Sequence, residues 1–132
     1  MAPVDDLPLF EMANLEPHQT GIEGTIYIST RQGSHAPRVK YYAGRPGDNQ
    51  PSMSVLIGPN PEVAESHLPV RTVNRVAPMV REWVRLNHEK LRDFWFNGNT
   101  WYQREVDAFI DGLEKYPESA APSARPSGPR RR

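Results

Sequence analysis

Residues 73–95 read VNRVAPMVREWVRLNHEKLRDFW, and this stretch decides the fold. Its mostly apolar positions recur at spacings of three and four, which is the period of one helix face. We therefore expect a long amphipathic helix over residues 70–96, ended by the signal Asn97-Gly98-Asn99. Pro78 lies within the stripe, so it either starts the main helix or kinks it. The stripe consists of Val73, Val76, Ala77, Val80, Trp83, Val84, Asn87, Leu91, Phe94 and Trp95.

Three strands are expected before this helix. Residues 22–31 alternate apolar and polar side chains, as a half-buried strand does. Residues 37–43 alternate in the same way, and residues 53–57 form a third, apolar strand after the turn-forming stretch 45–49. Short connections favour an antiparallel meander. Pro37 cannot donate to a strand ladder, which fits a first-residue or edge position, and an edge strand at 37–43 would be able to pair with another chain.

Two further helices are expected. Asn60-Pro61 predicts the start of a short helix over 62–66. Thr100, with Gln103 three residues later, predicts a capping box for a last helix over 101–116. The fold class is therefore α+β, in the order βββαα: a three-stranded antiparallel sheet packed against a long amphipathic helix and a C-terminal helix.

The chain divides into one folded unit and two ends. Its 132 residues suit a single domain, which we place at 22–116. The acidic segment 1–21 has no sustained period, so we expect it to be partly disordered or to dock on the domain as a strap. Residues 117–132 are rich in Pro, Ser and Arg and cannot bury enough apolar surface to offset their ordering entropy. We expect this tail to be disordered.

Composition excludes several classes of protein. Without cysteine there is no disulfide framework and no thiolate metal site. The stretch 1–16 lacks the basic and apolar regions of a signal peptide, and no apolar run approaches the roughly 20 residues that span a bilayer. We therefore expect a cytoplasmic protein that does not contact membranes.

No catalytic or metal-binding motif is recognisable. The 4 histidines are scattered, and none has a zinc-ligand spacing with another on one element. The sequence has neither a nucleophile elbow nor a phosphate-binding loop, and the acidic residues of the last expected helix have the spacing of a solvated face. We expect no catalytic residue, no metal and no cofactor.

The strand at 37–43 is the best candidate for a binding surface. Alternation places Arg38, Lys40 and Tyr42 on one face of it, and further basic residues flank the strand at its two turns. Cations for phosphates and rings for base stacking are typical of nucleic-acid binders, although a solvated sheet face shows the same pattern. The acidic stretch 1–23 would also be able to cover this face. The candidate binding residues are Arg31, His35, Arg38, Lys40, Tyr42 and Arg45.

The helix stretch resembles a known family. Residues 80–95 are similar to V-x-E-W-x-x-L-H-x-x-E-L-x-x-x-W, the helix motif of a bacterial domain-of-unknown-function family with catalogue number 4160. A strand segment resembles its N-P-P-H-F-H-V-x-Y-G, except that Arg38 and Lys40 replace two histidines, while Asn87 replaces the helix histidine. The resemblance spans 22–97 and implies a small α+β accessory protein, often encoded beside another small domain as toxin–antitoxin pairs are. It implies no established activity. The matching helix residues are Val80, Glu82, Trp83, Leu86, Leu91 and Trp95.

Three functions follow from these observations. The leading hypothesis is a non-catalytic interaction or regulatory module whose partner is another small, operon-encoded protein. The alternative is a nucleic-acid-binding protein that uses the basic sheet face. A third reading is a hydrolase or nuclease whose site is assembled from distant elements.

Overall fold

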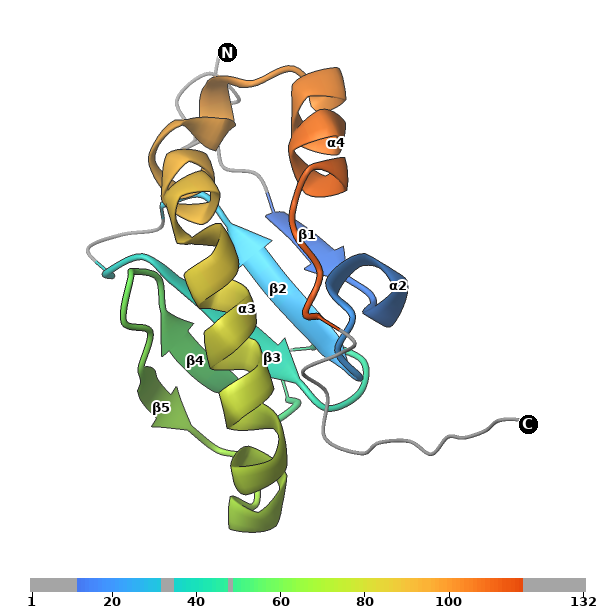
Figure 1. Cartoon of the computed structure of the whole chain (residues 1–132), viewed down its shortest axis with the longest axis vertical. Helices are drawn as coiled ribbons and strands as arrows, with labels where there is room; N and C mark the ends of the chain where they lie inside the picture. The colour runs from blue at the N-terminus through green and yellow to red at the C-terminus, as the bar shows by residue number, and fades with distance from the viewer. Residues whose placement is uncertain (1–11, 32–34, 48, 118–132) are drawn as a thin grey trace.

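The computed structural model describes residues 12–31, 35–47 and 49–117. They form an antiparallel sheet and a long helix that crosses one face of it (Figure 1). The predicted α+β class is confirmed, but the sheet has five strands rather than three. In chain order the elements are β1 (Met12–Leu15), α2 (Pro17–Thr20), β2 (Thr25–Ser29), β3 (Arg38–Tyr42), β4 (Met53–Leu56), β5 (Val63–Ser66), α3 (Val70–Asn97), the 3₁₀ turn η1 (Gly98–Thr100) and α4 (Gln103–Asp111).

Each strand pairs with its neighbour in sequence. The order is β1-β2-β3-β4-β5 and every pairing is antiparallel, so the predicted meander is confirmed. The prediction that the strand at 37–43 lies at an edge is wrong, because β3 lies in the middle of the sheet and bonds to β2 and β4 on its two sides. Pro37 precedes β3, where its missing N–H removes no bond between the paired residues of the ladder.

The additional strand β1 comes from the N-terminal segment 1–21, which was predicted to be partly disordered or to dock on the domain as a strap. It pairs with β2 along its whole length, from Met12 opposite Ser29 to Leu15 opposite Ile26. Leu15 is 1% exposed and belongs to the core, which explains why this stretch joins the sheet. The folded unit therefore begins at least ten residues before the predicted boundary at 22. The acidic stretch 1–11 lies outside the described residues.

The additional strand β5 occupies the stretch predicted to be a short helix, and that prediction is wrong. Residues 63–66 pair with β4, with a register shift between Ser54 and Val55. The pairing is extended on both sides, because the Leu56 amide donates to the Glu62 carbonyl and the His67 amide donates to the Ser52 carbonyl (both 2.9 Å). A five-residue helix forms few internal hydrogen bonds, whereas a strand here satisfies the outer side of β4.

The helix α3 is the predicted long helix. It runs through Pro78, which lies inside it rather than at its start. Pro78 is exposed, so the carbonyl oxygen that lacks its amide donor lies on the solvent side of the helix. None of the helices in the described part of the chain has the length and apolar character that crossing a bilayer requires. The core between α3 and the sheet includes Val76, Val80, Trp83, Phe94, Ile26, Val39, Tyr41 and Met53.

The last helix, α4, is shorter than the predicted 101–116. Its first turn begins after Tyr102, whose amide donates to the Glu105 carboxylate (2.8 Å). The predicted cap at Thr100 is wrong, because the Thr100 hydroxyl donates instead to the carbonyl of Asn97 (2.8 Å) within η1. Beyond α4 the chain returns to α2, where the Tyr116 amide donates to the Thr20 carbonyl (2.7 Å). Of the predicted disordered tail 117–132, all but the first residue lies outside the described ranges.

Candidate binding groove

The face of the sheet opposite α3, here called the groove face, carries the candidate site. Strand alternation turns Ile26, Val39 and Tyr41 toward α3 and turns their neighbours the other way. A groove of about 690 Å³ lies on this side. Its lining consists of Met12, Asn14, Tyr27, Ser29, His35, Arg38, Lys40, Tyr42, Pro46, Gly47, Ser52, Ser54, Glu65, His67 and Trp95.

One polar side chain from each strand contributes to a single row across the groove. The register pairs every member of this row with the next one, from β1 to β5. Directly opposed residues in antiparallel strands have Cβ atoms about 5 Å apart, so these side chains are neighbours. In order across the sheet, the row is Asn14, Tyr27, Lys40, Ser54 and Glu65.

The middle of the groove is basic. Lys40 is exposed, and Arg38, two residues earlier on β3, is half-buried on the same face. Among the described residues neither cation forms an ion pair with a carboxylate, and the Arg38 Nε donates to the carbonyl of Ala36 (3.2 Å). Two positive charges in a recess attract an anionic group more strongly than the same charges on a convex surface.

The β5 edge of the groove has the opposite character. Glu65 ends the row, and its Oε2 lies 3.5 Å from the Nε2 of His67. Both side chains are more than half exposed, so this contact is screened by solvent. The groove is therefore polar along its whole width but positive only near β3.

The aromatic side chains of the groove are largely engaged in the fold. Tyr42 is only 9% exposed, and the Tyr27 hydroxyl contacts the Met12 sulfur (3.3 Å). Trp95 also lines the groove and is 3% exposed. Its indole N–H has no hydrogen-bond partner within the described ranges. The rings of Tyr42 and Trp95 are therefore largely covered.

The structure brings together four of the six residues predicted from sequence. His35, Arg38, Lys40 and Tyr42 line one groove. Arg45 is exposed in the loop after β3 and is not among the lining residues.

Arg31, the remaining predicted residue, lies just beyond the groove. Its amide donates to the carbonyl of Trp95 (2.6 Å), and its guanidinium carbon is 5.7 Å from the centroid of the Phe96 ring. These contacts connect the end of β2 to the last turns of α3 and place Arg31 beside the groove residue Trp95.

Sequence reasoning missed the residues that β1 and β5 contribute. Asn14 was missed because its stretch showed no period long enough to indicate a strand. Glu65 was missed because 62–66 was predicted to be a helix, and His67 because it directly follows that stretch. The spacing of Glu65 and His67, two residues apart, was the one available signal, since it places both on one face of a strand.

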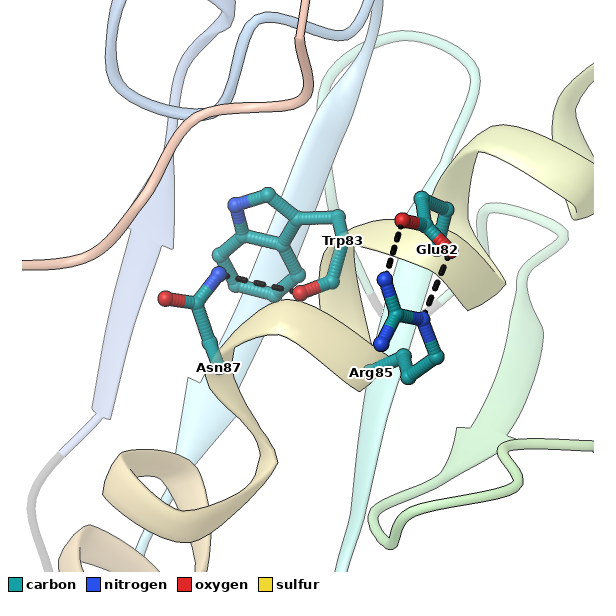
Figure 2. A network of polar contacts seen from close by, with 4 residues as sticks. All are labelled: Glu82, Trp83, Arg85 and Asn87. Carbon is teal, nitrogen blue, oxygen red and sulfur yellow. Dashed lines mark hydrogen bonds and ion pairs between the residues drawn. The ribbon is translucent and has the colours of Figure 1, made fainter.

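The three positions at which the resembled family has histidine lie in two different places. Arg38 and Lys40 line the groove. Asn87 is 2% exposed on the buried side of α3, where its amide donates to the carbonyl of Trp83 (2.9 Å; Figure 2). The helix position is therefore part of the core, and only the two strand positions line the groove.

Within the described ranges, His, Asp and Glu side chains nowhere gather in a group of three or more that could hold a metal ion. Comparisons with protein-family models, with curated proteins and with solved structures found no match to this chain. The proposed function therefore rests on the groove and its charges.

Proposed function

We propose that this protein is a non-catalytic binding module whose groove receives an acidic, extended segment of a partner protein. One observation carries the proposal: Arg38 and Lys40 lie in a groove whose floor is a continuous polar row, and neither has a carboxylate partner among the described residues. The resemblance to family 4160 supports a small, operon-encoded protein as the partner.

A peptide segment suits the groove because the groove presents groups of every kind. Lys40 donates to an acidic side chain, Asn14 donates to or accepts from a peptide backbone, and Glu65 accepts from donors at the other edge. Within a few residues, a peptide combines anionic side chains with backbone donors and acceptors. Extended peptides are recognised by sheet proteins through such a combination of backbone and side-chain contacts.

A single-stranded nucleic acid, the second candidate, suits the groove less well. Sequence-tolerant binding of single strands relies on rings that stack on bases, and here Tyr42 is almost fully covered. Glu65 would also repel phosphates that followed the row toward β5. The specific feature that favours nucleic acid is the pair of cations on β3, which a phosphate backbone would contact equally well.

Selection from a library of random 12-residue peptides displayed on phage tests the proposal. The bait is the full chain, and counter-selection uses the Lys40→Glu, Arg38→Glu double variant. We expect the enriched peptides to be rich in Asp and Glu, and synthetic copies to bind the double variant at least about tenfold more weakly, which corresponds to about 1.4 kcal/mol.

The matched control is Arg71→Glu, which reverses an exposed charge on α3 away from the groove and should change affinity less than about twofold. Circular dichroism of each variant establishes that the fold is retained. Peptides that bind the double variant as well as the wild type would overturn the proposal. Binding of a labelled (dT)20 strand that is tighter than any peptide, and lost in the double variant, would establish the nucleic-acid candidate instead.

A further inference from the structure

Two arginines lie over an exposed aromatic ring just outside the groove. Phe96, in the last turn of α3, is 40% exposed. The guanidinium carbon of Arg92 is 5.2 Å from the centroid of its ring, and that of Arg31 is 5.7 Å away. The ring therefore attracts both cations.

Both guanidiniums remain available to an anion. Arg31 and Arg92 are exposed, and neither has a carboxylate partner among the described residues. Other arginines of the same chain do have one, because Arg75 bonds to Glu23 (2.8 Å) and Arg85 bonds to Glu82 (2.7 Å). The donors of the Arg31–Arg92 pair are thus the kind that binds a carboxylate or a phosphate.

The chain leaves the groove strands close to this pair. Tyr27 opposite Lys40 is the last pairing of β2 with β3, and β2 ends at Ser29, two residues before Arg31. Alternate residues of a strand are about 7 Å apart and point to one side, so Lys40 and Arg38 are separated by about that distance along β3. Because the strands are antiparallel, Arg31 lies beyond the Arg38 end of this pair of cations, where its amide donates to the carbonyl of the groove residue Trp95.

We infer that the partner segment runs parallel to β2 and β3 and carries acidic residues at alternate positions. Two of its carboxylates meet Lys40 and Arg38, because alternate side chains of an extended peptide share the spacing of about 7 Å that separates these two residues on β3, and the third meets the Arg31–Arg92 pair beyond Arg38. This inference rests on the proposed function and adds the direction and spacing of the ligand.

Two peptides of identical composition test the spacing. One is Ser-Glu-Ser-Glu-Ser-Glu-Ser and the other is Ser-Ser-Glu-Glu-Glu-Ser-Ser, both acetylated and amidated so that only the glutamates carry charge. Each is titrated into the ¹⁵N-labelled full chain and followed by the amide shifts. We expect the alternating peptide to bind about five- to tenfold more tightly, because only it presents its three carboxylates on one side.

Variants then locate the third carboxylate. The Arg31→Gln, Arg92→Gln double variant should bind the alternating peptide no more tightly than the wild type binds the block peptide. Arg71→Gln is the control and should leave both affinities unchanged. Amide spectra of the free variants establish that the fold is intact, since the side chains of Arg31 and Arg92 are exposed.

The outcomes separate this inference from the function on which it rests. Equal binding of the two peptides that is still weakened by Lys40→Glu would overturn the alternate spacing and leave the function standing. Absence of binding by either peptide, together with no enriched acidic peptide from the library, would overturn both. A (dT)20 strand that displaces the alternating peptide and binds more tightly would overturn the ligand class.

Discussion

Asn87 and Glu114, which are 27 residues apart, bind each other through two hydrogen bonds. The Asn87 Nδ2 donates to the Glu114 carbonyl (2.9 Å), and its Oδ1 accepts the Glu114 amide (2.8 Å). The same Nδ2 donates to the carbonyl of Trp83 (2.9 Å), as Figure 2 shows. A single buried amide thus attaches the segment after α4 to the middle of α3, on the side away from the groove.

Replacing Asn87 with alanine should lower the free energy of unfolding by about 2–3 kcal/mol. The change removes two interactions with the chain after α4 and leaves a partly buried amide and carbonyl without partners, which costs about 1–3 kcal/mol. Urea denaturation of Asn87→Ala and wild type measures the difference.

The neighbouring ion pair provides the control. Glu82 and Arg85 bond to each other on the outer side of the same helix turn (2.7 Å; Figure 2). The guanidinium of Arg85 lowers the pKa of Glu82 through this hydrogen bond, but the pair is solvated. Glu82→Gln should therefore change stability by less than about 0.5 kcal/mol. A loss as large as that of Asn87→Ala would contradict the special role of the buried amide.

The position of Asn87 also illustrates how far the fold could be predicted. Its spacing placed it correctly in the buried stripe of α3, because 28 residues of helix repeat the pattern many times. Its partner was beyond prediction, since nothing local to Asn87 indicates a contact with residue 114. The four-residue strands β1 and β5 were not predicted, for a related reason. Strands that short are stabilised by their neighbours rather than by their own sequence.

The residues of the candidate site also divide into those that could be predicted from the sequence and those that could not. Arg38, Lys40 and Tyr42 could be placed on one face because they alternate within a single strand. Asn14 and Glu65 complete the row only through pairing with β2 and β4, which requires the strand order. A sequence read element by element thus locates the basic centre of the groove and misses both of its edges.

Replacing Gly98 with alanine, a change that usually stabilises a helix end, should destabilise this protein. Gly98 has right-handed helical dihedral angles, for which alanine would ordinarily be preferred. However, a Cβ at this position would lie 2.5 Å from the ring of Phe94 and 3.0 Å from the methyl group of Thr30. Because Phe94 is fully buried, Gly98→Ala should cost roughly 1–3 kcal/mol, measured by thermal or urea denaturation.

Gly58→Ala is the matched control for this prediction. Apart from Gly58 and its two neighbours in the chain, no atom of the described residues lies within 4 Å of a Cβ built on Gly58, so the added methyl group meets open space. Its effect on stability should stay within about 0.5 kcal/mol. Equal stabilities of the two alanine variants would show that the ring of Phe94 moves aside at little cost.

Tyr41 should make the stability of the fold depend on pH in the alkaline range. Its side chain is fully buried, and its hydroxyl donates to the carbonyl of Glu23 (2.8 Å). Burial, and to a lesser extent the carboxylate of Glu23, raises the pKa of Tyr41 to about 12, while the cation of Arg75 opposes this increase. The phenol is therefore held neutral in the folded state at a pH where it ionises in the unfolded chain.

The sign of the pH effect follows from this difference. Below pH 10 both states keep the proton, and the contribution of Tyr41 is fully present. Between pH 10 and 12 only the unfolded state loses the proton, so stability falls, by about 1.3 kcal/mol for this residue between pH 9 and 11. Urea denaturation at the two pH values measures this loss of stability.

Tyr41→Phe should be about 1 kcal/mol less stable than wild type at pH 9, because it lacks the hydrogen bond. On going to pH 11, however, it should lose about 1.3 kcal/mol less than wild type. Tyr102→Phe, at a position that is 66% exposed, should keep the wild-type dependence; if Tyr41→Phe keeps it as well, the alkaline loss arises elsewhere.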